Sequence, residues 1–319
     1  MEETLLHVSY HQDGSREIFY QSPRDRSDVN AVTVSETTDG RGKGVFARRD
    51  IPAGARVLAE VPLIEWHGLS SELCEEPLVD VSKYAISEAV AKLSARDRST
   101  FFSLFQNYEL HGPRKHAYGV WASSALPIDE PPNTAIFAVA AFANHSCAPN
   151  AHLSWNAQTR CMTCHALAPI RRGAEVCVSY LVDGGQHGPR FQRRAALSET
   201  FGFLCSCARC ALRDDDLVGS DARQSRIASL DARLRAVPPP SLRADLVAQQ
   251  LSLLDEESMM GTEWEVYARA REQAWREGDL EAARAWAHRA AESGRTALGE
   301  DSDAVQQYRR QAEEAPYFF

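Results

Sequence analysis

The sequence lacks the features that mark nucleic-acid-binding, membrane-spanning and exported proteins. Its 35 Lys and Arg residues are outnumbered by 44 Asp and Glu, a formal net charge of −9, so no general basic surface for nucleic acid is expected. Its apolar runs are too short to span a bilayer, and residues 1–10 show no secretory signal. We therefore expect no membrane contact and a cytoplasmic or nuclear location.

The cysteines are few enough to weigh one by one, and they are unevenly placed along the chain. Three of the eight cysteines, Cys205, Cys207 and Cys210, lie within six positions. A closed structural zinc site is tetrahedral and needs four ligands, so this run is one ligand short. Cys147 is the best candidate for the fourth ligand. Zinc would then tie a late segment of the chain to an earlier loop.

Other interpretations of this run are a disulfide and simple packing. A disulfide within C-x-C is sterically poor, and nothing indicates an oxidising compartment. Three inert cysteines this close together would be unusual, so metal binding is favoured. Cys161 and Cys164 lie in a predicted strand and point to opposite faces, which favours packing. Cys74 and Cys177 are also predicted to be packing thiols.

The chain changes character near residue 211. Short strand-like runs broken by Gly and Pro come before it and indicate a β-rich core. Residues 70 to about 110 have apolar residues at three-to-four spacing, which predicts a helical insertion. The predicted strands are 31–35, 45–47, 56–64, 151–155, 160–167 and 176–180.

The remainder of the chain predicts helices. Four amphipathic helices are expected at 241–254, 263–276, 280–298 and 303–312. The alanine-rich pattern after Gly278 fits the second helix of a tetratricopeptide-like antiparallel pair. Since only one such pair is convincing, we predict a helical bundle. A packing or solubility role and a partner-docking role both remain open.

The glycine-rich segment 40–44 resembles a dinucleotide-binding loop, but that loop must open a helix. The residues that follow contain Pro52 and Gly54 and predict strand, turn and strand. No G-K-[ST] follows either, so a Rossmann or P-loop site is not expected. The glycines then either permit a tight hairpin turn or let backbone N–H and C=O groups come close to a ligand.

Four motifs follow one another between about residues 31 and 211, namely Gly42–Ala47, Asn144–Asn150, Gly173–Tyr180 and Phe203–Cys210. In kind and in order they resemble the motifs of the SET domain, the fold of S-adenosylmethionine-dependent protein lysine methyltransferases. The chain looks most like the branch that pairs SET with a MYND zinc finger and a helical C-terminal domain. Residues 48–130 hold a single cysteine, so no MYND finger fits there. The chain is more similar to fungal-type SET proteins without the finger.

The resemblance implies an α+β protein built on a β-rich SET fold. It would begin with an N-terminal extension (1–30), followed by the SET domain (31–200) with a helical insertion (about 70–130). A cysteine-rich zinc-binding post-SET segment (201–211) would follow. The remainder (212–319) would be a tetratricopeptide-like helical bundle.

The resemblance also implies a cofactor site for S-adenosylmethionine. Its methionine end would be held by Arg41, Lys43, Gly44 and Val45. Asn144 and His145 would hold the amino group and the adenine, and Phe203 would stack on the adenine ring. Alone, His145 could simply cap a turn.

The same resemblance makes Tyr180 the catalytic tyrosine, which also borders the cofactor, and places Phe201 in the lysine channel. It makes Cys147, Cys205, Cys207 and Cys210 the ligands of a structural Zn²⁺, in agreement with the ligand count. Tyr180 also has a structural interpretation, because a tyrosine at a strand end commonly packs its ring and exposes its hydroxyl. The four ordered motifs favour the functional interpretation.

Three functions remain open. The first is methyl transfer to a lysine of a protein substrate. The second is a SET-like enzyme acting on a small-molecule metabolite. The third is a binding module without activity that uses the helical region as its contact surface. The presence of Tyr180 and Phe203 argues against the third.

Overall fold

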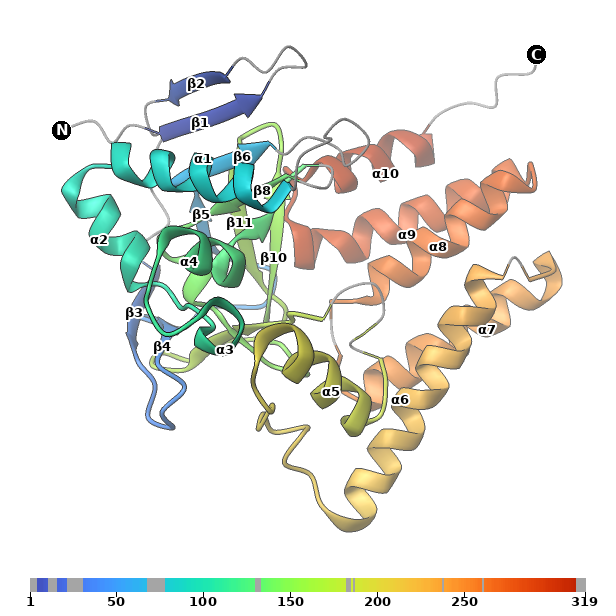
Figure 1. The fold of residues 1–319 in the computed structure, drawn as a ribbon. Helices are drawn as coiled ribbons and strands as arrows, with labels where there is room; N and C mark the ends of the chain where they lie inside the picture. Colours follow the sequence, from blue (N-terminus) through green and yellow to red (C-terminus); the bar gives the residue numbers. More distant parts are fainter. Residues whose placement is uncertain are drawn as a thin grey trace. The chain divides into compact units, whose positions relative to one another are not determined.

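The structure is a computed structural model of the chain (Figure 1). It describes residues 5–10, 16–21, 31–67, 78–129, 133–181, 185, 187–236, 238–259 and 261–313. The chain divides into two compact units. The first comprises Met1–Arg48, Leu58–Ala143 and Ser154–Thr163, and the second comprises Arg49–Val57, Asn144–Leu153 and Cys164–Phe319.

The first unit contains a five-stranded sheet of order β2-β1-β6-β8-β7. Its strands are β1 (Leu5–Tyr10), β2 (Arg16–Gln21), β6 (Ile64–His67), β7 (Leu126–Pro127) and β8 (Thr134–Ile136). The β1–β2 pair is antiparallel, and β1 also pairs in parallel with β6. The segment predicted as an N-terminal extension therefore contributes two strands to this sheet.

Among the described residues, four α-helices follow β6 in the first unit, where the sequence predicts a helical insertion. They are α1 (Leu78–Lys92), α2 (Ala95–Ser103), α3 (Tyr108–His111) and α4 (Ala117–Ser124). The hydroxyl of Ser94 caps α2 by accepting from the Asp97 backbone N–H at 3.1 Å. Phe101 and Val120 are fully buried and pack with Ile64 and Ile136 of the sheet. The apolar spacing of the insertion thus builds one core with the strands.

A β-hairpin in the first unit contains the glycine-rich segment. Its strands are β3 (Val32–Glu36) and β4 (Lys43–Ala47). Gly40 and Gly42 have φ angles of 77° and 84°, which side chains with a Cβ rarely adopt. The Thr37 N–H donates to the Gly42 carbonyl at 2.7 Å and closes the turn. The tight hairpin predicted as one use of the glycines is present.

The second unit places two motifs of the sequence side by side. Strand β9 (Asn144–His145) pairs in parallel with β12 (Glu175–Val178). Helix α5 (Arg190–Phe201) follows and ends at Gly202, whose φ of 75° makes a left-handed cap. The sequence analysis does not predict α5. Strands β5 (Arg56–Glu60), β10 (Ala151–Asn156) and β11 (Cys161–Ala166) contain residues of both units.

The rest of the second unit is helical, as predicted. Its helices are α6 (Asp214–Arg235), α7 (Pro240–Glu256), α8 (Glu263–Arg276), α9 (Leu280–Leu298) and α10 (Asp303–Glu313). Helices α8 and α9 lie side by side and antiparallel (Figure 1), the arrangement predicted for this pair. Small buried residues such as Ala270, Ala274 and Ala287 let these helices approach closely.

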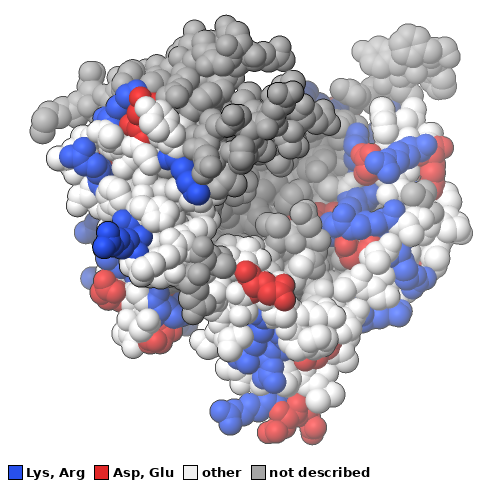
Figure 2. Space-filling view, viewed as in Figure 1, with Lys and Arg blue, Asp and Glu red and all other residues white. Residues whose placement is uncertain are grey.

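No helix in the described ranges is long and apolar enough to cross a membrane. On the face drawn in Figure 2, Lys and Arg side chains are interspersed with Asp and Glu side chains. That face therefore carries mixed charge.

Candidate functional site

Four cysteine side chains converge in the second unit. The sulfur atoms of Cys147, Cys205, Cys207 and Cys210 all lie within 4.8 Å of one another. The Cys147 Sγ is 3.9 Å from that of Cys205 and 3.6 Å from that of Cys210. Thiolates about 2.3 Å from a tetrahedral zinc ion would be about 3.8 Å apart. The spacing and the donor set therefore fit a tetrahedral metal ion.

The sulfur atoms of this four-cysteine centre perturb one another. Hydrogen bonding, first of all with Cys147, lowers the pKa of Cys207, and it lowers the pKa of Cys210 to about 6. The Cys205 thiol in turn raises the pKa of Cys147. The mutual hydrogen bonds thus favour the thiolate, the form that binds metal, at Cys207 and Cys210.

The other described cysteines lie outside this centre. All are free thiols rather than disulfides. Cys164 is buried, and burial raises its pKa to about 12, as expected for a packing residue. Cys161 and Cys177 are half-buried. Cys74 lies outside the described residues.

His145 lies against the four-cysteine centre. Its Nδ1 accepts from the Tyr180 backbone N–H at 3.0 Å, and its Nε2 is 3.3 Å from Cys147 Sγ. Burial lowers the pKa of His145 to about 4, so the ring is neutral at pH 7. The neutral tautomer that satisfies both contacts carries its proton on Nε2 and donates it to sulfur. His145 therefore connects Cys147 to the backbone of Tyr180, two residues after the end of β12.

The side chain of Asn144 is also fixed by β12. Its Nδ2 donates to Glu175 Oε1 at 2.7 Å. The neighbouring Asn150 donates to the Glu175 carbonyl at 2.8 Å and accepts from the Cys177 N–H at 2.8 Å. These bonds hold the motif that begins at Asn144 along β12.

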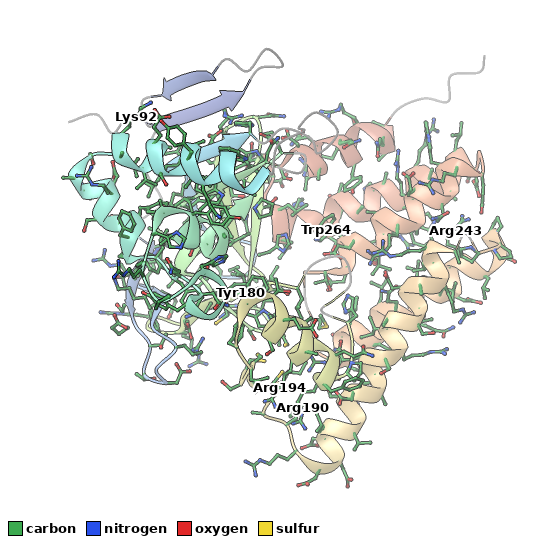
Figure 3. All side chains as sticks on the ribbon, viewed as in Figure 1. Lys92, Tyr180, Arg190, Arg194, Arg243 and Trp264 are labelled. Atoms are coloured by element: carbon green, nitrogen blue, oxygen red, sulfur yellow. The ribbon has the colours of Figure 1, made fainter. Side chains whose placement is uncertain are left out.

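Three aromatic rings gather beside His145. The centroid of the Tyr180 ring (Figure 3) is 5.0 Å from that of Phe201 and 6.3 Å from that of Phe203. The His145 ring is 5.4 Å from Tyr180 and 6.2 Å from Phe203. The three aromatic residues are half-buried. The structure thus brings together the predicted catalytic, channel and adenine-stacking residues.

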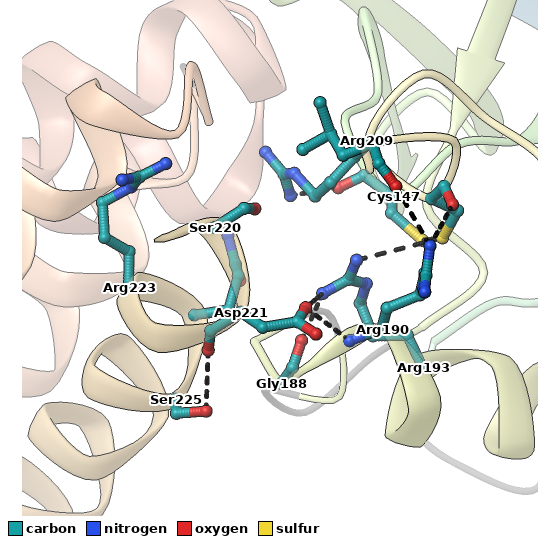
Figure 4. Close-up of polar contacts among 12 residues, drawn as sticks. Cys147, Gly188, Arg190, Arg193, Arg209, Ser220, Asp221, Arg223 and Ser225 are labelled. Atoms are coloured by element: carbon teal, nitrogen blue, oxygen red, sulfur yellow. Dashed lines mark hydrogen bonds and ion pairs between the residues drawn. The ribbon is translucent and has the colours of Figure 1, made fainter. Parts of the chain in front are cut away.

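Sequence reasoning misses the arginines of α5. Arg194 Nε donates to the Cys205 carbonyl at 2.8 Å, and Arg190 Nη1 donates to the Leu212 carbonyl at 3.1 Å (Figure 3). Arg193, between them, has Nη2 3.9 Å from Cys210 Sγ (Figure 4). Their spacing of i, i+3 and i+4 puts them on one helix face. That spacing, just before the cysteine run, is the signal that sequence analysis could have used.

The remaining predicted cofactor residues lie in the first unit. Gly44 and Val45 are buried in β4. Arg41 lies within the glycine turn, and Lys43 is the first residue of β4. Lys43 Nζ lies 5.6 Å from the centroid of the Phe142 ring, a cation–π contact. Arg41 Nε forms an exposed ion pair with Asp39 at 2.7 Å.

A buried carboxylate holds the segment before Asn144 in the first unit. Glu60 Oε1 accepts from the N–H groups of Ala138 and Val139 at 2.7 and 3.0 Å. Its Oε2 accepts from the Ala140 N–H at 2.9 Å, at the start of the 3₁₀ helix η3 (Ala140–Phe142). Glu60 is missed by sequence reasoning, because backbone donors leave no pattern of side chains.

Residues 42–181 match the SET domain model. Histone-lysine N-methyltransferase set5 of Schizosaccharomyces pombe is 29% identical over 69% of this chain and 64% of its own length. Human protein-lysine N-trimethyltransferase SMYD5 is 35% identical over 25% of this chain and 19% of its own. The chain thus spans less than two thirds of each relative. The predicted resemblance to SET proteins related to the SET/MYND branch is confirmed.

Proposed function

We propose that the chain methylates lysine side chains of a protein substrate, because residues 42–181 match the SET domain model. The convergence of Tyr180, Phe201 and Phe203 beside His145 carries the proposal. The names of the relatives, which are histone-lysine and protein-lysine methyltransferases, support a lysine substrate. A small-molecule substrate is the second candidate.

S-adenosylmethionine supplies an electrophilic methyl group on a sulfonium when bound. The proposed residues for it are Arg41, Lys43, Gly44, Val45, Asn144, His145, Tyr180 and Phe203. Both ring nitrogens of His145 have partners, so we expect its backbone rather than its ring to contact the cofactor. The half-buried ring of Phe203 offers a face on which the adenine can stack.

The acceptor lysine must lose its proton before it attacks. Its reference pKa of about 10.4 means that presenting the neutral amine at pH 7 costs about 4–5 kcal/mol. Aromatic walls from Phe201 and Tyr180 would exclude water and so disfavour the ammonium form. The Tyr180 hydroxyl would orient the amine, and alignment of the reacting groups would provide much of the rate enhancement.

A Zn²⁺ ion would be held by Cys147, Cys205, Cys207 and Cys210. Four protein ligands leave no open coordination position, so its role would be structural rather than catalytic. By holding Cys205, it would fix the position of Phe203 two residues earlier in the chain.

Tyr180→Phe tests the proposed catalytic role. We expect nearly unchanged affinity for S-adenosylmethionine by calorimetry and at least a 100-fold lower rate of labelled methyl transfer, since orientation contributes on about this scale. Tyr84→Phe, at an exposed tyrosine of α1, is the matched control and should transfer at the wild-type rate. Wild-type turnover in Tyr180→Phe would remove Tyr180 from the mechanism.

The same assay separates the alternatives. A wild-type chain that binds no cofactor would support the binding module. Binding without methylation of any protein in a lysate would favour a metabolite substrate. Mass spectrometry of labelled proteins would identify a protein substrate, for which we propose a cytoplasmic or nuclear source. Docking of partners on the helices after residue 212 is a further proposal.

A further inference from the structure

The four-cysteine centre concentrates negative charge in a buried place. Four thiolates and one divalent ion carry a formal charge of −2 together. Cys147, Cys205 and Cys210 have only 0%, 3% and 1% of their surface exposed. A buried charge is costly unless oppositely charged or donor groups lie against it. We therefore expect buried cations among the residues around the centre.

Arg193 is such a cation. Its side chain is fully buried, with Nη2 3.9 Å from Cys210 Sγ and Nη1 donating to the Gly188 carbonyl (Figure 4). Its guanidinium is also 4.0 Å from the carboxylate of Asp221 on α6. The Asp221 carboxylate accepts from the Arg190 backbone N–H at 2.7 Å, which fixes the start of α5 as well.

Arg209 is the second buried cation, and it lies inside the cysteine run. Its Nη1 donates to the Cys147 carbonyl at 2.5 Å, and its Nη2 donates to the Glu257 carbonyl at 2.6 Å. Its Nε lies 3.4 Å from the Glu257 carboxylate. One side chain thus joins both segments of the metal centre to the end of α7.

Glu257 is in turn held by α6. Its carboxylate accepts from Ser220 at 2.8 Å, Arg223 at 2.7 Å and Gln224 at 2.9 Å. The side chain is only 3% exposed, whereas that of the preceding Glu256 is 54% exposed. These two neighbours therefore provide a buried carboxylate in the network and an exposed one at its edge.

We propose that Arg193 and Arg209 are positioning residues of the metal centre, and that Asp221 and Glu257 hold their guanidinium groups in place. Helices α6 and α7 are then part of the metal site rather than a separate appendage. The inference rests on the metal binding proposed above. It assigns a function to the helical region that needs no partner protein.

The test measures metal retention in the 319-residue chain purified with its metal. Elemental analysis first gives the metal content, and a chromogenic zinc chelator then gives the release rate. We expect Arg193→Gln to release zinc about 10–100 times faster than wild type, the range typical of lost outer contacts to metal ligands. Arg193→Lys should fall between the two. Arg226→Gln, at an exposed α6 arginine bonded to Gln249, should match wild type.

A second pair of variants tests the link to the helices. Glu257→Gln keeps the shape but removes the charge that faces Arg209, and we expect faster zinc release than from Glu256→Gln. Circular dichroism confirms that each variant is folded. If Arg193→Gln does not fold, the zinc release rates of Arg193→Lys, Glu257→Gln and Glu256→Gln still test the positioning roles.

The outcomes separate the two proposals. Equal release rates for Glu257→Gln and Glu256→Gln, with Arg193→Lys at the wild-type rate, would overturn the positioning roles alone. A wild-type chain purified without metal, and unable to take up zinc, would overturn the metal centre and these roles with it. Faster release from Arg193→Gln and Glu257→Gln, with unchanged controls, supports the inference.

Discussion

Two backbone segments of this chain, one in each unit, are held by charged side chains of opposite sign. In the first unit, the buried Glu60 carboxylate accepts from consecutive N–H groups of residues 138–140. In the second, the half-buried guanidinium groups of Arg190 and Arg194 donate to carbonyls of residues 205, 210 and 212, and the buried Arg209 of this segment donates to the Cys147 carbonyl.

The difference in sign follows from what each segment exposes. Residues 138–140 open a 3₁₀ turn, and the first N–H groups of a helix have no partner within it. A carboxylate satisfies them directly. The cysteine run presents carbonyls and thiolates, which need donors and positive charge. The first segment leads to Asn144, and the second follows Phe203, so each borders a motif proposed to bind the cofactor.

The largest expected effect is that of Cys207→Ser, which removes a proposed metal ligand from the second segment. The first segment should keep its structure. A structural zinc site contributes directly to folding, so loss of a ligand should release the metal and loosen residues 200–212. Hydrogen exchange with mass spectrometry should show faster exchange there and unchanged exchange in residues 134–142. Cys164→Ser, at a buried thiol outside the centre, is the control and should retain metal. Full metal content in Cys207→Ser would contradict the ligand assignment.

Glu60→Gln should have the next largest effect, on the first segment. The amide keeps one acceptor oxygen but turns an NH₂ group toward backbone N–H donors, which leaves buried donors unpaired. We expect a loss of about 2–3 kcal/mol in the free energy of unfolding, measured by urea denaturation. Exposed Glu36→Gln on β3 should change it by less than about 0.5 kcal/mol. Equal unfolding midpoints in the two variants would show that the Glu60 carboxylate is not needed to hold the segment.

The two segments also differ in how far sequence predicts them. Coordination chemistry fixes the number of zinc ligands, so three clustered cysteines predict a fourth, and Cys147 is indeed in the group. Glu60 could not be predicted, because its partners are backbone N–H groups about 80 residues away in the chain. Helices were predictable where the apolar periodicity was strong, as in α8 and α9. Helix α5 was missed because its buried residues are only Arg193 and Leu197, which make no apolar stripe.

The smallest expected effect is the loss of stability in acid that the Glu257 carboxylate, the partner of Arg209 in the second segment, should cause. Burial opposes ionisation of Glu257, but hydrogen bonds from Gln224, Ser220 and Arg223 outweigh it and lower the pKa below its ordinary value of 4.5. The ionised carboxylate therefore stabilises the folded state above about pH 4.5, and this contribution is lost as the pH falls through the lowered pKa.

Glutamine does not titrate, so thermal unfolding of wild type and Glu257→Gln at pH 7 down to pH 3.5 isolates this contribution. Wild type should be the more stable at neutral pH, and the difference should shrink below about pH 4.5, by at most about 1.4 kcal/mol per pH unit. Exposed Glu256→Gln should show a much smaller change with pH, because water screens its ion pair with Arg223. A constant difference across this range would mean that Glu257 contributes through its shape and not its charge. Glu257 would then differ from Glu60 in stabilising its segment by packing alone. Another negatively charged group would have to balance the positive charge of Arg209.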